Sequence, residues 1–116
     1  METRFEMTVI GTGMAGLAAA LFAARQGIAA AVVGSSAEII FASGFFDVLG
    51  VHPIEQGRIR INPWKGIDAL VRDNPKHPYA KISKKDIGES LETVIVFLQK
   101  AGLSYCLRSN RNAMVV

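Results

Sequence analysis

Three glycines near the N-terminus have the spacing of a loop that binds phosphate groups. Gly11, Gly13 and Gly16 form a Gly-x-Gly-x-x-Gly pattern between an apolar segment and an alanine-rich one. In such a loop the first glycine permits a tight turn, the second lets backbone amides approach a pyrophosphate, and the third lets a helix pack against a strand. The pattern predicts a nucleotide-phosphate site built from main-chain N–H groups at a helix N-terminus.

The candidate cofactor-binding residues include every position of this loop. They are Gly11, Thr12, Gly13, Met14, Ala15 and Gly16. Because short glycine clusters also arise in ordinary loops, the alternative is a turn that only packs a helix on a strand. The predicted strand before the loop and the predicted helix after it favour the nucleotide site.

A strand–helix–strand unit has to position this loop. The apolar segments 5–10 and 29–33 predict strands buried on both faces, as in parallel sheets. A helix is predicted over 14–26, and Gly27 follows it, where a helix C-cap favours a left-handed residue. The predicted fold class is therefore α/β, an incomplete Rossmann-like FAD/NAD(P)-binding βαβ fold with a parallel sheet and flanking helices.

Cofactor choice is normally encoded at the end of the second strand, where an Asp or Glu binds the adenosine ribose. That position here is Gly34, and the nearest acid after it is Glu38. No arginine stands there to hold a 2′-phosphate, so the sequence does not favour NADP as the bound cofactor. The missing acid disfavours ordinary FAD or NAD binding. Gly34 and Ser35 remain candidate cofactor-binding residues, because the serine hydroxyls at 35 and 36 can donate hydrogen bonds to a ribose or a phosphate.

The remainder of the chain is first irregular and then helical. Residues 35–82 are predicted to be an irregular insertion punctuated by proline and glycine. A clear helix is predicted after Ser83, which can cap it, and its apolar stripe is interpreted as core. The other short elements expected are a strand over 58–61, a helix over 66–73, and strands over 105–107 and 113–116.

Composition indicates one domain with a sizeable core. The chain has 116 residues, 50% hydrophobic and 20% charged, so residues 1–116 are interpreted as at most one domain. The single cysteine, Cys106, excludes an internal disulfide and fits a cytoplasmic compartment. The chain ends within an apolar run and lacks the further parallel strands of a dinucleotide-binding sheet. We therefore expect it to be the N-terminal portion of a longer protein.

Charge and residue spacing exclude several classes of function. The net charge is +3, and the basic residues are mostly scattered singly, which is typical of a solvated surface rather than a nucleic-acid site. The uncharged segment 7–24 follows Glu6, where a signal peptide needs positive charge. No nucleophile–base pair and no metal-ligand spacing occurs, so the catalytic residues are unknown and no metal is expected. The loop and packing side chains interpreted as structural are Asp47, His52, Trp64, His77 and Tyr79.

Three segments carry a resemblance to a known family. They are Thr8-Val-Ile-Gly-Thr-Gly-Met-Ala-Gly-Leu17, Phe41-Ala-Ser-Gly-Phe-Phe-Asp-Val-Leu49 and His77-Pro-Tyr79. On these the chain resembles the FAD/NAD-dependent flavoprotein oxidoreductases, and within them the family of B subunits of anaerobic glycerol-3-phosphate dehydrogenases. That family also lacks the acid at the position of Gly34. The resemblance spans nearly the whole chain and only the opening portion of the longer family members.

The resemblance implies a cofactor, an activity and partners. The cofactor would be FMN, as described for the family, or FAD; FMN needs no acid at Gly34 but lacks the pyrophosphate that glycine loops usually hold. Ser43 and Gly44 would approach the flavin or its phosphate, the alternative being an ordinary turn. The implied reaction converts glycerol 3-phosphate to dihydroxyacetone phosphate and passes electrons to quinone. The implied partners are a catalytic subunit and an iron–sulfur membrane-anchor subunit, which would hold a cytoplasmic chain at the inner membrane.

Two other functions stay open. The chain would serve as a cofactor-free assembly module, or remnant of an oxidoreductase, if an exposed sheet edge pairs with another chain. A stand-alone NAD-binding domain is disfavoured by the missing acid at Gly34. The chain by itself is expected to be inactive, because the segments that close a flavoprotein active site would be missing.

Overall fold

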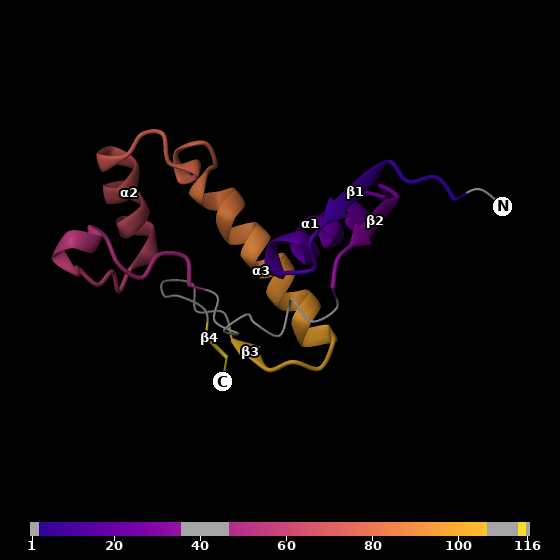
Figure 1. Ribbon diagram of the computed structural model, residues 1–116. Helices are drawn as coiled ribbons and strands as arrows, with labels where there is room; N and C mark the ends of the chain where they lie inside the picture. The colour runs from indigo at the N-terminus through magenta and orange to yellow at the C-terminus, as the bar shows by residue number, and fades with distance from the viewer. Residues whose placement is uncertain (1–2, 36–46, 107–113, 116) are drawn as a thin grey trace. The chain divides into compact units, whose positions relative to one another are not determined.

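The computed structural model describes residues 3–35, 47–106 and 114–115 of the chain (Figure 1). The chain forms two compact units, Met1–Ser43 and Gly44–Val116. The first unit holds β1 (Met7–Ile10), α1 (Met14–Arg25) and β2 (Ala30–Val33). The second holds the 3₁₀ turn η2 (Ile54–Gln56), α2 (Pro63–Asp73), the 3₁₀ turn η3 (Pro78–Ala80), α3 (Lys84–Lys100), β3 (Tyr105–Cys106) and β4 (Met114–Val115).

The first unit is a strand–helix–strand element around a parallel pair of strands. β1 and β2 pair in parallel, with Met7 opposite Ala30 and Ile10 opposite Val33. The α/β class and the parallel sheet predicted from the sequence are therefore confirmed in this unit. β1 begins two residues later than expected and β2 one residue later. Such differences are common at the frayed ends of short strands.

The helix of this unit agrees with its sequence signals. α1 begins directly after the glycine loop, and Gly27 follows it with φ +76°, the left-handed backbone expected after a helix end. Its small side chains pack on the strands, and the buried residues of the unit are Ala23 on the helix and Val9 on β1.

In the second unit, α2 begins earlier than the sequence suggests. The prediction of a short helix over 66–73 gives the end correctly, but the helix starts at Pro63. The Asn62 side chain caps it by accepting a hydrogen bond from the Lys65 N–H at 3.1 Å, and Pro63 occupies the first helical position, where its missing N–H costs nothing. Four residues on this helix, Pro63, Gly66, Ile67 and Ala69, are buried.

A short two-stranded ribbon, residues 50–60, precedes α2. The expected strand over 58–61 is reduced to an isolated antiparallel bridge between Val51 and Ile59. Two backbone hydrogen bonds hold the ribbon, one from the His52 N–H to the Arg58 carbonyl at 3.0 Å and one from the Arg60 N–H to the Gly50 carbonyl at 2.8 Å. The turn η2 between the two arms leaves too little length for a regular strand.

The long helix α3 follows its predicted cap. The Ser83 Oγ accepts from the Asp86 N–H at 3.0 Å, and Ile95 in the middle of the apolar stripe is buried. Lys84 forms an ion pair with Asp68 of α2. Two short antiparallel strands, β3 and β4, pair beyond α3 and lie within the segments predicted as strands. None of the helices formed by the described residues is both long and apolar enough to cross a membrane.

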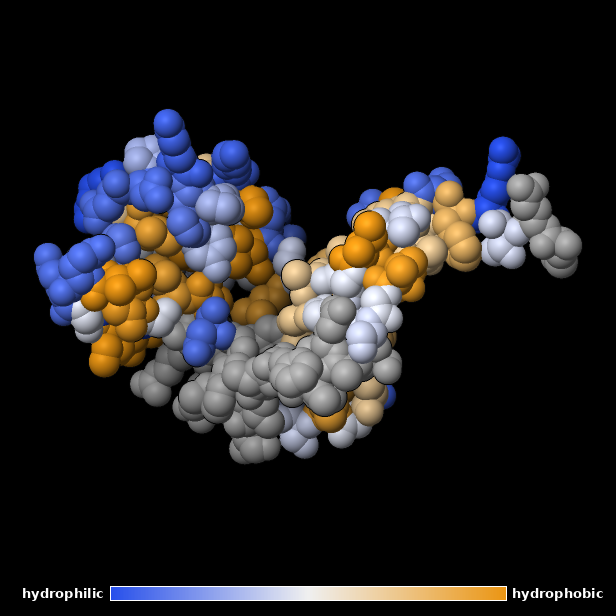
Figure 2. All heavy atoms as spheres, viewed as in Figure 1, coloured by the Kyte–Doolittle hydropathy of each residue, from blue (hydrophilic) through white to orange (hydrophobic). Residues whose placement is uncertain are grey.

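Large apolar side chains are exposed on both units (orange in Figure 2). In the first unit Ile10 and Val33, at the carboxyl ends of the two strands, are 87% and 55% exposed. In the second unit Val51, Ile54, Ile59 and Ile61 are exposed on or directly after the ribbon, and Ile82, Val96, Phe97 and Leu103 are exposed elsewhere.

Candidate functional site

The glycine loop joins β1 to α1 at the carboxyl end of the parallel pair. Gly11 has φ +107°, a backbone conformation that side-chain-bearing residues rarely adopt. Its N–H donates to the Val33 carbonyl at 2.7 Å, which extends the ladder between the strands by one bond. The turn out of β1 that the sequence assigned to Gly11 therefore has the expected conformation.

Gly16 allows α1 to lie directly on β1. A Cβ added at this position would be 2.2 Å from the Gly11 carbonyl oxygen and 3.4 Å from Cγ1 of Val9. The first distance is far below any van der Waals contact, and the atom it would meet is backbone. Any side chain at Gly16 would push the helix away from the strand, as expected for the third glycine of the pattern.

Gly13 faces open space. It is the N-cap of α1, with extended backbone at φ −72° and ψ 178°, and a Cβ added there would meet no atom within 4 Å. An alanine therefore fits the fold at this position, so packing within the chain does not require the glycine. An open position at a helix N-terminus is what a closely approaching phosphate needs.

The first amides of α1 are the candidate phosphate donors. Met14, Ala15 and Gly16 occupy the first turn, where a helix provides no internal acceptor for N–H groups. No side chain caps this end, and the first turn holds no acidic residue. The positive end of the helix dipole is thus not neutralised by a capping carboxylate, and the residues fit a nucleotide phosphate.

The other candidate residues are Thr12 of the loop and four residues that follow β2 in the sequence, Gly34, Ser35, Ser43 and Gly44. The Thr12 hydroxyl donates to the Ser35 carbonyl oxygen, a contact that sequence reasoning missed because it links residues with no shared periodicity. Gly34 lies against the loop, since a Cβ there would be 3.1 Å from both N and Cγ2 of Thr12. Ser43 and Gly44 lie outside the described residues, so their role stays a prediction.

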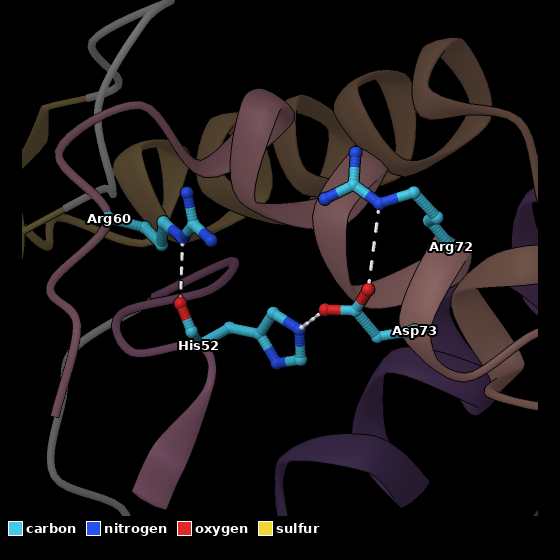
Figure 3. Close-up of polar contacts among 4 residues, drawn as sticks. All are labelled: His52, Arg60, Arg72 and Asp73. Carbon is cyan, nitrogen blue, oxygen red and sulfur yellow. Dashed lines mark hydrogen bonds and ion pairs between the residues drawn. The ribbon is translucent and has the colours of Figure 1, made fainter. Parts of the chain in front are cut away.

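A second polar cluster lies in the other unit (Figure 3). His52 Nε2 donates to Asp73 Oδ2 at 2.9 Å, and its own carbonyl oxygen accepts from Arg60 Nε at 2.8 Å. Arg72 Nε lies 3.5 Å from the other Asp73 oxygen. The hydrogen bond from His52 is the main cause that lowers the pKa of Asp73; desolvation opposes it, and the positive charge of Arg72 adds to the lowering.

This cluster attaches the ribbon to the end of α2. The His52 side chain is only 12% exposed, whereas Asp73 is half exposed. The sequence placed His52 in a linker and gave no reason to pair it with a residue 21 positions away. The last turn of a helix disfavours a carboxylate, and the donors from His52 and Arg72 offset that cost. The arrangement is structural, in agreement with the role expected for His52.

The remaining candidate side chains also have structural partners. His77 Nδ1 accepts from the Tyr79 N–H at 3.1 Å, and the Tyr79 hydroxyl donates to the Val48 carbonyl at 2.8 Å. The Trp64 ring lies near Gly88 of α3. Within the described ranges no three His, Cys, Asp or Glu side chains gather as a metal site would require. The glycine loop is therefore the candidate functional site.

Comparison with known proteins agrees with this site. A family model described as "FAD binding domain" matches residues 6–111. The chain is 33% identical over 100 residues to the B subunit of anaerobic glycerol-3-phosphate dehydrogenase from Aliivibrio fischeri, a match that covers 85% of this chain and 22% of the relative. The same subunit of Yersinia pseudotuberculosis is 32% identical over 111 residues, covering 94% and 26%. No solved structure shows a significant match.

These curated relatives are much longer than the region compared, since the chain spans about a quarter of their length. The family match, in contrast, includes nearly every element of both units. The chain therefore belongs to the FAD-binding domain family of flavin-dependent oxidoreductases, in which it is homologous over most of its length to the B subunit of anaerobic glycerol-3-phosphate dehydrogenase.

Proposed function

We propose that this chain binds the flavin nucleotide of an anaerobic glycerol-3-phosphate dehydrogenase. The reaction would oxidise glycerol 3-phosphate to dihydroxyacetone phosphate and pass the electrons to quinone. The observation that carries the proposal is the glycine loop, in which an open Gly13 precedes an uncapped helix N-terminus beside a parallel strand pair. The similarity to the dehydrogenase's B subunit over most of the chain supports the substrate class.

The chain's own contribution is to bind and orient the cofactor. The amides of Met14, Ala15 and Gly16 would hold a phosphate, and the absence of a side chain at Gly13 would let the phosphate approach them. A bound flavin supplies the redox chemistry, so no nucleophile–base pair is needed in this portion. FAD is the cofactor that the family indicates, and FMN is the alternative.

The proposed partners follow from the same similarity. The relatives are named as one subunit of a dehydrogenase, so the chain would act with a catalytic subunit and an iron–sulfur membrane-anchor subunit. This assembly would place the chain at the cytoplasmic face of the inner membrane. Binding of flavin is the part of the proposal that the chain can be tested for by itself.

The first experiment measures the visible absorbance of the purified chain and identifies released cofactor by mass. A flavin band with the mass of FAD or of FMN supports the proposal and separates the two cofactors. A colourless chain that takes up neither FAD nor FMN on titration contradicts it.

Gly13→Ala provides the matching variant. Its methyl group would occupy the space in front of the first amides of α1 without meeting any protein atom within 4 Å. We expect flavin affinity, measured by titration calorimetry, to fall about tenfold or more. The free energy of unfolding, measured by urea denaturation, should not change. The control is Gly50→Ala, because Gly50 is equally open but belongs to the other unit. Equal flavin affinity in both variants would place the cofactor elsewhere.

One observation favours a second candidate function, that of a cofactor-free assembly module. Among the described strands, β1 and β2 pair only with each other, and Ile10 and Val33 at their ends are exposed. Exposed strands with apolar ends can pair with another chain. Sedimentation velocity distinguishes the candidates: a colourless, concentration-dependent oligomer supports assembly, and a coloured monomer supports flavin binding.

A further inference from the structure

The end of β2 carries no acid at the position where dinucleotide sites normally read the adenosine ribose. In Gly-x-Gly-x-x-Gly sites an Asp or Glu about 20 residues beyond the glycines accepts a hydrogen bond from the ribose 2′-hydroxyl. Here the residue directly after β2 is Gly34. Glycine could stand at this position because the acid was lost by chance, or because the surrounding atoms leave no room for a side chain.

The surroundings disfavour any side chain at this position. A Cβ at Gly34 would be 3.1 Å from the Thr12 backbone N, 3.1 Å from the Thr12 methyl carbon Cγ2 and 3.3 Å from the Gly11 Cα. Each distance is shorter than an ordinary van der Waals contact, so the loop would have to move by a few tenths of an ångström. Two of the three atoms belong to backbone, which is the part least able to move.

Two hydrogen bonds hold the loop in this crowded position. The Gly11 N–H donates to the Val33 carbonyl at 2.7 Å, and the Thr12 hydroxyl donates to the Ser35 carbonyl. Residues 33 and 35 are therefore both tied to the loop, with Gly34 between them. Thr12 thus covers the place where a carboxylate at position 34 would have to start.

No other described acid of the first unit can take over the ribose contact. Glu6 lies at the opposite end of the strands, where its carboxylate accepts from the Ala29 N–H at 3.2 Å. Glu38 lies outside the described residues, so the first test below includes a variant of it.

We infer that Thr12 and Gly34 form a specificity-determining pair, which makes flavin-nucleotide binding independent of the adenosine ribose hydroxyls. Recognition then rests on the phosphate groups at the helix N-terminus, and the ligand class is a flavin nucleotide with or without a ribose-bearing adenosine. This inference rests on the proposed function, because it concerns the same site.

The first test compares two ligands on the unmodified chain. FAD and an FAD analogue whose adenosine ribose lacks the 2′-hydroxyl are titrated by calorimetry, and we expect dissociation constants within about twofold of each other. A preference for FAD of about tenfold or more, the effect of one hydrogen bond to a carboxylate, overturns the inference while the proposed function stands. Loss of that preference in Glu38→Gln would identify Glu38 as the ribose acceptor. If neither of these ligands nor FMN binds, both the proposed function and the inference fail, whereas binding of FMN alone supports both.

The second test installs the acid. Gly34→Glu alone should unfold at lower urea concentration, because the side chain meets Thr12 and Gly11. Adding Thr12→Ala removes the Thr12 methyl group and the hydrogen bond to the Ser35 carbonyl. The double variant should therefore recover much of the lost stability to urea. It should also prefer FAD over the deoxy analogue by about tenfold. A single Gly34→Glu variant that is as stable as the wild type overturns the inference, and this readout does not depend on any ligand.

Discussion

The glycine loop of the first unit and the ribbon of the second are fixed by opposite means. Around the loop, the decisive features are missing side chains: Gly16 lets backbone touch backbone, and Gly34 leaves room for Thr12. Around the ribbon, the decisive features are polar side chains that cross between segments, as in the hydrogen bond between His52 and Asp73. A side chain added at Gly16 or Gly34 would disturb the first region, whereas removing a polar side chain would disturb the second.

The two regions also place their apolar residues differently. In the first unit the buried side chains, Val9 and Ala23, lie between the strand and the helix as in any βαβ unit. In the ribbon, His52 and Arg60 are turned toward α2, while Ile59 and Val51 share the other face and are exposed. The ribbon is therefore attached to its helix both by polar contacts and by close packing at Gly66, where an added Cβ would be 3.1 Å from Cγ of Arg60.

The largest expected effect breaks the first region. Gly16→Ala places a Cβ 2.2 Å from the Gly11 carbonyl oxygen, so the helix must move off the strand. We expect a loss of about 3 kcal/mol in the free energy of unfolding, typical of severe overpacking, measured by urea denaturation. Gly50→Ala is the control and should change stability by less than about 1 kcal/mol. Equal stability of the two variants would show that α1 does not lie on β1 as described.

A smaller effect is expected when one hydrogen bond of the second region is removed. Tyr79→Phe deletes the hydroxyl that donates to the Val48 carbonyl at 2.8 Å and keeps the ring. We expect a loss of about 1 kcal/mol in the free energy of unfolding, the usual net value of such a bond. Hydrogen exchange should report the change near residue 48 and not in the first unit. A change in the first unit instead would contradict the separation of the two regions.

The smallest effect concerns pH and sharpens the role of the ribbon's polar contact. The folded-state pKa of Asp73 lies below its unfolded value, so the folded state favours the ionised carboxylate. The resulting stability is present above the unfolded pKa and is lost as pH falls through the folded pKa. Urea unfolding followed from neutral pH into the acid range should therefore show a shallower decline for Asp73→Asn than for the wild type. Identical profiles would mean that the contact with His52 does not stabilise the fold.

Most of the first unit was predictable from the sequence because its determinants are local. The strand, the three glycines, the helix and the second strand follow one another within residues 7–33, and each has its own signal. The start of α2 was missed by three residues, although Asn62 as N-cap and Pro63 at the first helical position are helix-start signals that the sequence carries. Residues 58–61, where apolar and charged residues alternate, were predicted to be a strand, but the short arms of the ribbon form one isolated bridge.

The polar partners were beyond sequence reasoning for a different reason. Thr12 and Ser35 are 23 residues apart, and His52 and Asp73 are 21 apart, and neither separation corresponds to a period of a helix or a strand. A hydroxyl or an imidazole can hydrogen-bond with many groups, so its type does not identify its partner. Only the positions of the backbone in space select one.

The sequence alone determined the βαβ order, the glycine loop and the similarity to a flavoprotein family, because glycine spacing and apolar periodicity act over short distances along the chain. Only the tertiary structure decided how much room surrounds each glycine. Gly13 is open and Gly16 is crowded, although both are the same residue type three positions apart. A side chain at Gly34 would be crowded by Thr12, a constraint that arises only when β2 returns beside β1.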